Sequence, residues 1–450
     1  MRVSLATIAQ WLGCPAPEGA ERLWVEGVAF DSRQVRPKDL FVAAPGEKTD
    51  GHLFVSEAAS RGALAALVAR PVNVPLPQLV VSDTVGALQT LASRIRQEAG
   101  FQVAAVTGSV GKTTTKSMLA ALLARCFRVA QTQGSRNSQL GLPAEMCNLA
   151  QDVDWFVAEA GMSRKGELTR LGEVLRPQAL LYTRIAPVHL EFFPSVEAIA
   201  EAKAELIPFL DPQGVLVLNA TDPYQQSFAL RFSGRKLSYG LPGKSEVWAE
   251  NLASRGLLGT SFTLAGPLGG FAVDLPLPGL HQVENFLGAA CLARVLGVPV
   301  EELAAAAAQL RPQPHRGEVH RLPSGAILVD DSYNASPVAV ARMLELLAQT
   351  PGRRVAVLGE MLELGPQAPD FHREVGAKAR GLCHRLVAVG GENARVLAEA
   401  FGTEGRYVAS AEEAEEVLEN ELEEGDVVLI KGSRGIGLDR LVAALLAGRG

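Results

Sequence analysis

The sequence predicts an α/β protein of three domains. Its 450 residues are enough for roughly two to four domains, each with its own core. From Phe101 onward, strand-like apolar runs alternate with stretches of helical apolar spacing, as in mostly parallel sheets that helices cover on both faces. Breaks near Ala99-Gly100 and at Arg311-Pro312-Gln313-Pro314 interrupt this alternation. We therefore expect domains at residues 1–98, 99–310 and 311–450.

The first domain is expected to be a small mixed α/β unit. The chain starts with a short strand that leads into a helix capped near Ser4 or Thr7. Strand-like alternation covers Leu23–Phe30 and Leu40–Ala44, and helical spacing covers Val55–Ala69 and Val85–Glu98.

The second domain is expected to hold a parallel sheet with an antiparallel insert at the glycine-rich segment Val247–Leu275. Its strand-like runs are Val103–Val106, Trp155–Ala158, Ala179–Thr183 and Gly214–Leu218, and its helical stretches include Lys112–Cys126, Ala198–Leu210 and Gln282–Leu296. The third domain repeats the alternation, which predicts a smaller Rossmann-like sheet with strands at Ala326–Val329, Val355–Leu358, Leu386–Val389 and Val427–Ile430.

Composition favours a soluble globular protein, because 48% of the residues are hydrophobic and 20% are charged. The net charge of −6, with no dense basic block, argues against binding to nucleic acid or to an anionic membrane. The five cysteines are scattered and lack C-x-x-C spacing, so we expect a reducing cytoplasm and neither a disulfide framework nor a zinc site. We expect neither a membrane-spanning segment nor a signal peptide.

A strand, a glycine-flanked turn and a helix at residues 103–123 predict an ATP site. The turn reads Thr107-Gly108-Ser109-Val110-Gly111-Lys112-Thr113-Thr114. Its small residues let backbone N–H groups approach an anion, and the helix adds the positive end of its dipole. Lys112 would neutralise the β- and γ-phosphates and the Thr113 hydroxyl would hold Mg²⁺. Because Val106 stands where the full motif has its first glycine, an ordinary glycine turn is the alternative.

Two polar residues follow neighbouring strand-like runs. Glu159 ends the run Trp155–Ala158, and His189 follows Ala179–Thr183. The carboxyl ends of parallel strands are where such sheets bind ligands, and a carboxylate there commonly holds Mg²⁺ beside a phosphate loop. The alternatives are a helix cap or solvated acid for Glu159 and a structural role for His189.

Lys203 lies in the middle of an apolar stripe. Six residues surround it at helical spacing: Val196, Ile199, Ala200, Leu206, Ile207 and Leu210. No glutamate of this helix stands three or four residues away, so the usual ion pair is unavailable. Desolvation would lower its pKa, and the neutral amine could take up CO₂ to give a carbamate that binds Mg²⁺. The alternative is a lysine that snorkels from the edge of the stripe.

Weaker signals come from the rest of the chain. Asn285, near a Pro-Gly turn that opens a helix, could read an adenine edge or cap the helix. The loop Asp330-Asp331-Ser332-Tyr333-Asn334-Ala335-Ser336-Pro337 could contact a nucleotide or an amine, or serve as a helix cap. Arg316 is a candidate for reaching the γ-phosphate. Lys431 follows a strand and belongs either to an anion-binding turn or to an ordinary loop.

Taken together, these motifs resemble the Mur ligases over essentially the whole chain. The shared features, in order, are the T-G-x-x-G-K-T-T loop, Glu159, His189 followed by Glu191, Lys203 and Gly279-x-His281-x-x-x-Asn285. The runs at 330–337 and 359–365 (GEMLELG) are similar to motifs of the MurF type. Departures are Ser138, Ala160, Phe192 and Ser336, where the family usually has Asn, Leu, Gly and Asn. None of them removes a charged or metal-binding group.

The resemblance implies an ATP-dependent ligase that joins D-alanyl-D-alanine to a UDP-N-acetylmuramoyl-tripeptide through an acyl phosphate, in peptidoglycan precursor synthesis. The first domain would bind the UDP part of the substrate, and the others would bind ATP and the dipeptide. We expect a cytoplasmic monomer.

The resemblance also assigns residues to roles. Lys112, Lys203 and His189 would be catalytic, and Thr113, Glu159, His189 and carbamylated Lys203 would serve two Mg²⁺ ions. The ATP-binding set would be Thr107, Gly108, Ser109, Val110, Gly111, Lys112, Thr113, Thr114, His281, Asn285, Arg316 and Asp331. The substrate-binding set would be Ser32, Arg33, Asn137, Asn334 and Lys431.

Two other functions stay open. One is a related Mur ligase or a folylpolyglutamate synthetase-like ligase that adds a single amino acid, which the motifs at 330–337 and 359–365 disfavour. The other is a nucleotide-regulated binding protein without ligation chemistry. The set of Glu159, His189 and Lys203 disfavours it, because binding alone needs no second metal.

Overall fold

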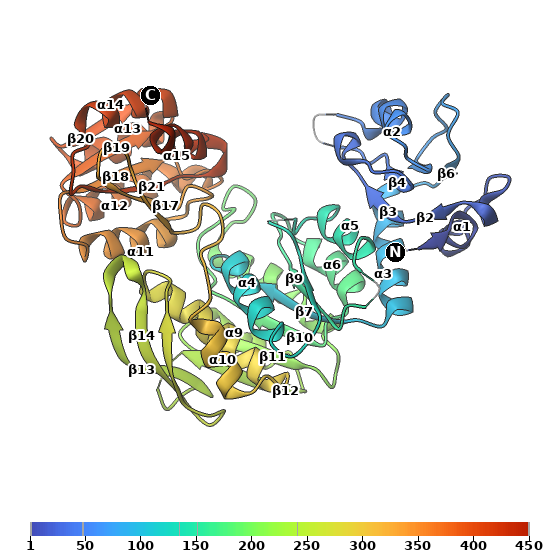
Figure 1. Cartoon of the computed structure of the whole chain (residues 1–450), viewed down its shortest axis with the longest axis horizontal. Coiled ribbons are helices and arrows are strands. Elements are labelled where there is room, and N and C mark those ends of the chain that lie inside the picture. The colour runs from blue at the N-terminus through green and yellow to red at the C-terminus, as the bar shows by residue number, and fades with distance from the viewer. Residues whose placement is uncertain (1, 47–48, 135, 151, 241, 449–450) are drawn as a thin grey trace.

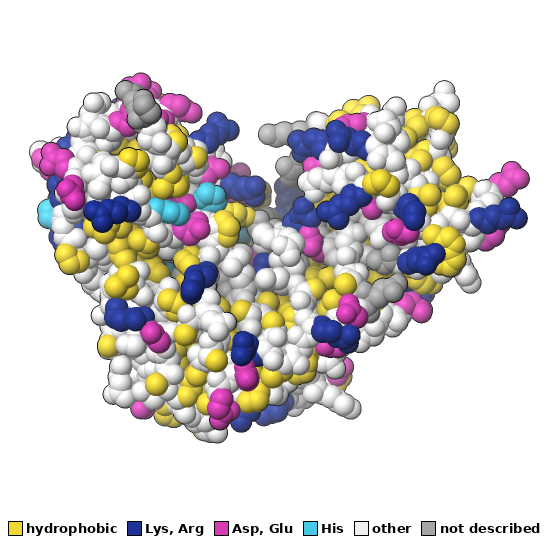
Figure 2. Space-filling view, viewed as in Figure 1, with side chains coloured by type: hydrophobic (Ala, Val, Ile, Leu, Met, Phe, Trp, Pro, Cys, Tyr) yellow, Lys and Arg dark blue, Asp and Glu magenta, His cyan; other side chains and the backbone are white. Residues whose placement is uncertain are grey.

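The computed structural model describes residues 2–46, 49–134, 136–150, 152–240 and 242–448. It confirms the predicted fold class: three α/β domains follow one another along the chain (Figure 1). The N-terminal and C-terminal domains stand on opposite sides of the central domain, and a hollow rimmed by Lys and Arg side chains separates the two outer domains (Figure 2). No helix among the described residues is both long and apolar enough to cross a membrane.

The N-terminal domain contains a four-stranded parallel sheet in the order β3-β4-β5-β6 and a separate antiparallel pair, β1-β2. The Ser4 Oγ accepts a hydrogen bond from the Thr7 N–H at 3.1 Å and so caps the first helix, as predicted. The elements are β1 (Val3–Ser4), α1 (Leu5–Leu12), β2 (Trp24–Val25), β3 (Gly27–Ala29), β4 (Asp39–Val42), α2 (Val55–Ser60), β5 (Ala65–Val68), β6 (Gln78–Val80) and α3 (Thr84–Ala99).

The predicted helix over Val55–Ala69 is wrong in its second half. The helix α2 ends at Ser60, and Ala65–Val68 is the strand β5, which pairs with β4 and β6. Gly62, at φ +96°, takes a left-handed conformation that glycine adopts without steric cost, and it lets the chain leave the helix. Burial between two strands overrides the helical propensity of the alanines.

The central domain is built on one nine-stranded sheet in the order β15-β14-β13-β12-β11-β10-β7-β9-β8. The predicted insert is the antiparallel edge β13-β14-β15, which continues this sheet rather than forming a separate one. The strands are β7 (Gln102–Thr107), β8 (Val129–Gln131), β9 (Trp155–Glu159), β10 (Ala179–Tyr182), β11 (Val215–Asn219), β12 (Arg235–Gly240), β13 (Val247–Ser254), β14 (Thr260–Ala265) and β15 (Phe271–Leu275).

Helices cover both faces of this sheet. Apolar side chains of α4, α9 and α10 fill one face, and those of α6 and α7 fill the other, where α3 of the first domain joins the same core. The helices are α4 (Lys112–Leu123), α5 (Gly141–Cys147), α6 (Glu167–Leu175), α7 (Val196–Ala204), α8 (Gln226–Ala229), α9 (Leu280–Val295) and α10 (Val300–Ala307).

The C-terminal domain is a Rossmann-like sheet of six strands in the order β16-β17-β21-β18-β19-β20, in which only β16 is antiparallel. Apolar clusters fill both faces of the sheet. The elements are β16 (Glu318–Arg321), β17 (Ile327–Asp330), α11 (Pro337–Ala348), β18 (Arg354–Gly359), α12 (Ala368–Arg380), β19 (Arg385–Val389), α13 (Glu392–Phe401), β20 (Gly405–Val408), α14 (Ala411–Glu421), β21 (Val427–Lys431) and α15 (Leu438–Ala447).

Candidate active site

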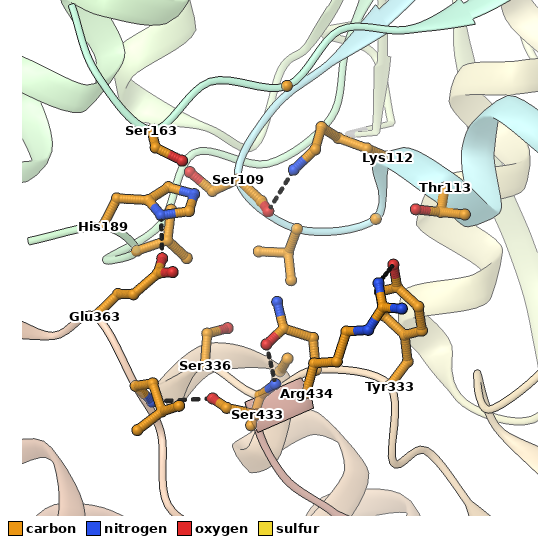
Figure 3. Close-up of a pocket in the computed structure, with 18 of the residues that line it drawn as sticks. Ser109, Lys112, Thr113, Ser163, His189, Tyr333, Ser336, Glu363, Ser433 and Arg434 are labelled. Atoms are coloured by element: carbon orange, nitrogen blue, oxygen red, sulfur yellow. Dashed lines mark hydrogen bonds and ion pairs between the residues drawn. The ribbon is translucent and has the colours of Figure 1, made fainter. Parts of the chain in front are cut away.

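The loop between β7 and α4 has no room for a side chain at its two glycines. A Cβ at Gly108, whose φ is +144°, would collide with the Thr183 Oγ1, and one at Gly111, whose φ is +88°, would collide with the Asn285 Oδ1. The Lys112 Nζ folds back and donates to the carbonyl oxygen of Ser109 at 3.1 Å (Figure 3). Burial lowers the pKa of this lysine. The loop thus presents backbone N–H groups and one cation to the adjoining cavity, as an anion site requires.

A polar cavity of about 340 Å³ lies between the central and C-terminal domains. Figure 3 shows Lys112 and Ser109 on its central-domain side and Tyr333 and Arg434 facing them from the C-terminal domain. Its lining includes these predicted site residues: Ser109, Val110, Gly111, Lys112, Thr113, Asn137, Glu159, His189, Arg316, Asn334 and Lys431.

Glu159 lies at the end of β9 and is 1% exposed. Its Oε1 accepts a hydrogen bond from the Asn137 Nδ2 at 2.7 Å. Its Oε2 is buried without a hydrogen-bond partner among the described residues, and the nearest cation, the Lys116 Nζ, is 3.9 Å away. A buried carboxylate oxygen left without a donor is costly unless it has another ligand, so this atom suits a metal ion.

Lys203, on α7, is also 1% exposed. Burial, and then the nearby positive charge of Lys112, hold its pKa well below the ordinary value, against the attraction of Glu159. Within the described residues, the Lys203 ammonium has no hydrogen bond and no ion pair. The apolar stripe therefore does desolvate this lysine, as the sequence pattern predicts.

His189 follows β10 and meets the C-terminal domain. Its Nδ1 is 2.5 Å from the Glu363 Oε2, and this hydrogen bond lowers the pKa of the Glu363 carboxyl (Figure 3). Both residues have a positive φ, +56° for His189 and +63° for Glu363. Glu363 lies in the GEMLELG motif, but its contact with His189 was not predicted.

Lys116 is the other residue that sequence analysis missed. It is 1% exposed, and its Nζ donates to the carbonyl oxygens of Thr132 at 2.6 Å and Gly134 at 3.0 Å. It stands three residues before Leu119 and seven before Leu123, on the apolar face of α4. A search for lysines that stand among apolar residues at helical spacing, which singled out Lys203, would also have found Lys116.

The predicted adenine contacts lie behind the phosphate loop. Asn285 touches Gly111 and donates from Nδ2 to the Gln282 Oε1 at 3.2 Å. His281 lines a second cavity of about 140 Å³ between α9 and α11, and burial lowers its pKa to about 4. Thr107 and Thr114 lie outside the large cavity: the Thr107 Oγ1 donates to the Ala160 carbonyl at 2.8 Å, and Thr114 faces the other side of α4.

The third domain contributes cations. Arg316 stacks on the Tyr333 ring at 4.1 Å and donates to the Thr113 Oγ1 at 3.4 Å, which places it beside the phosphate loop. Lys431 is 3% exposed and donates to the Asp331 Oδ2 at 2.5 Å and to the Asn334 carbonyl at 2.8 Å. Asp331 and Lys431, predicted as separate nucleotide and substrate contacts, thus form one ion pair, in which Lys431 is the buried member.

The first-domain residues lie apart from this cavity. Ser32 is buried and donates from Oγ to the Glu57 Oε2 at 2.8 Å. Arg33 is exposed and donates to both carboxylate oxygens of Asp31 at 2.9 Å. The structure does not bring either residue to the phosphate loop.

Comparison with known proteins identifies the family. The Mur ligase middle domain matches residues 106–293, the Mur ligase family catalytic domain matches 25–124, and the glutamate ligase domain matches 315–434. The chain is 36% identical to the UDP-N-acetylmuramoyl-tripeptide--D-alanyl-D-alanine ligase of Escherichia coli over 95% of each sequence. The chain belongs to the Mur ligase family.

Solved structures agree with this assignment. A crystal structure of MurF from Acinetobacter baumannii matches this Mur ligase with a TM-score of 0.91 at 28% identity, over 100% of this chain and 99% of that one. The MurF ligase of Thermotoga maritima in complex with ADP matches with a TM-score of 0.82 at 30% identity, over 94% of this chain and 97% of that one. This Mur ligase is therefore an ATP-dependent ligase.

Proposed function

We propose that this Mur ligase joins D-alanyl-D-alanine to a UDP-N-acetylmuramoyl-tripeptide at the expense of ATP, as a cytoplasmic monomer in peptidoglycan precursor synthesis. The observation that carries the proposal is the cavity in which the phosphate loop, Glu159 and His189 face the C-terminal domain. Full-length similarity to relatives that bear this ligase's name supports the choice of substrates.

The metal site of the proposal consists of Thr113, Glu159, His189 and Lys203. The buried Glu159 Oε2, which has no donor among the described residues, fits a cation. When bound, two Mg²⁺ ions supply positive charge that offsets the phosphates and the attacking carboxylate. Lys203 would join the site as a carbamate: its neutral Nζ bonds to the carbon of CO₂ and releases one proton to solvent. This turns a buried neutral amine into an anionic oxygen ligand.

Two steps form the amide. A carboxylate oxygen of the tripeptide bonds to the γ-phosphorus of ATP, the bond from that phosphorus to the β,γ-bridging oxygen breaks, and ADP leaves. The amine nitrogen of D-alanyl-D-alanine then bonds to the acyl carbon, the carbon–oxygen bond to phosphate breaks, and the amine loses a proton. Lys112 and the loop N–H groups orient the phosphates and reduce the repulsion between the two anions of the first step.

The remaining predicted residues take binding roles in the proposal. Arg316, next to Thr113, would reach the γ-phosphate, and Asn285 and His281 would approach the adenine. Asp331 would contact the nucleotide, and the substrate-binding set of Ser32, Arg33, Asn137, Asn334 and Lys431 would hold the two substrates. Closure of the C-terminal domain over the cavity would exclude water that hydrolyses the acyl phosphate.

Phosphate release from ATP tests the proposal. We expect release that requires both UDP-N-acetylmuramoyl-tripeptide and D-alanyl-D-alanine, and none when single amino acids or glutamate replace the dipeptide. Lys112→Ala should abolish turnover, whereas Lys244→Ala, which changes an exposed lysine, should not affect it. Equal release with a single amino acid, or near-normal ADP formation by Lys112→Ala, would contradict the proposal.

A further inference from the structure

Two side chains of the C-terminal domain contact the candidate metal site of the central domain: Arg316 donates to Thr113, and Glu363 contacts His189. Glu363 lies between β18 and α12, 174 residues from His189 in the sequence, and its Oε2 is 2.5 Å from the His189 Nδ1. The Glu363 side chain is 49% exposed, and the His189 side chain is 25% exposed. Among the described residues, Glu363 forms an ion pair only with His189. Its carboxylate can therefore accept a hydrogen bond from the imidazole without competition from another charged side chain.

The backbone around this contact is fitted closely as well. The Glu191 N–H donates to the Glu363 carbonyl at 3.2 Å, and a Cβ at Gly365 would lie 2.8 Å from the Leu190 carbonyl oxygen. His189 and Glu363 both hold left-handed backbone conformations, with φ of +56° and +63°. Non-glycine residues keep such conformations only where the surroundings enforce them, and they cluster at functional sites.

The chemistry of histidine explains what this contact would do. A neutral imidazole carries its proton on one nitrogen and offers the lone pair of the other. A carboxylate at Nδ1 keeps the proton there and leaves Nε2 for a metal ion, and such outer partners also fix the orientation of the ring. Glu363 is placed to select this tautomer.

We propose that Glu363 is a positioning residue through which the docked C-terminal domain completes the metal site: it accepts the Nδ1–H of His189 and so directs Nε2 toward Mg²⁺. This inference rests on the metal role of His189 in the proposed function. Coupling of this kind is reciprocal, so metal binding would in turn favour docking of the C-terminal domain.

Manganese binding to the full-length enzyme with ADP, followed by electron paramagnetic resonance, tests the inference without ligase turnover. Glu363→Ala should weaken Mn²⁺ binding about tenfold, the lower end of the effect of removing an outer partner. Glu363→Gln should retain most of the affinity, because its amide oxygen accepts the same hydrogen bond. Glu374→Ala, at an exposed glutamate of α12, is the matched control and should bind as the wild type does.

The double variant separates this role from a general loss of docking. If Glu363 acts through His189, adding Glu363→Ala to His189→Ala should weaken Mn²⁺ binding no further. A Glu363→Ala enzyme with wild-type affinity, or an additive loss in the double variant, would overturn the inference while leaving the proposed function intact. Wild-type Mn²⁺ affinity in His189→Ala would instead remove the metal role of His189 and the inference with it.

Discussion

Two buried lysines stand on helices beside Glu159, and their surroundings differ. Lys116 on α4 and Lys203 on α7 are each 1% exposed, and burial lowers the pKa of both. Lys116 donates to two backbone carbonyls and lies 3.9 Å from the Glu159 Oε2, whereas Lys203 has no such partner within the described residues. A buried ammonium with acceptors can stay charged and hold structure, while one without them is driven toward the neutral, reactive amine.

The largest effect we expect is on activity. Lys203→Met should reduce turnover by about 10³-fold, as loss of a group that stabilises the transition state does. Lys116→Met should cost only about tenfold, because Lys116 acts through Thr132, Gly134 and Glu159. Phosphate release measures both rates. Rescue of Lys203→Ala by a short carboxylate would support the carbamate, and full activity of the unrescued variant would rule it out.

Stability should change in opposite directions. Lys116→Met leaves the buried Thr132 carbonyl without its donor and also removes the hydrogen bond to the Gly134 carbonyl, so it should destabilise the protein by about 2 kcal/mol. Lys203→Met replaces a buried amine that has no partner among the described residues by an apolar chain of similar length, so it should leave stability unchanged or raise it by about 1 kcal/mol. Denaturant midpoints report the difference. An equal loss of unfolding free energy in both variants would contradict the difference in hydrogen bonding between the two lysines.

The smallest expected effect is on the pH dependence of stability. Since the pKa of folded Lys203 lies well below that of the unfolded chain, the unfolded state binds an extra proton between the two values. The free energy of unfolding should therefore rise with pH from the folded pKa up to about 10.4. In CO₂-free buffer, Lys203→Met should reduce this slope more than Lys116→Met does, and Lys244→Met should not alter it.

Much of the fold follows from the sequence, because strands buried on both faces and amphipathic helices alternate with short breaks. Ala65–Val68 is one exception: its residues favour a helix, and only pairing with β4 and β6 makes it a strand. Gly62 is a local sign that the helix ends, but the strand pairing itself joins segments that are distant in the sequence.

The candidate site likewise contains residues that local sequence patterns predict and contacts that they do not. Lys203 could be predicted because its apolar stripe is local to one helix, and the same test applied to α4 would have found Lys116. The contact between His189 and Glu363 could not be predicted, since it joins residues 174 positions apart across two domains. The pair of Asp331 and Lys431, 100 positions apart, was missed for the same reason.

The most direct test of this comparison is carbon-13 NMR of the enzyme in ¹³C-bicarbonate. If the unpartnered lysine is the reactive one, the wild type and Lys116→Met will show one carbamate carbon signal and Lys203→Met will show none. A carbamate signal that persists in Lys203→Met, or that disappears only in Lys116→Met, would contradict the account.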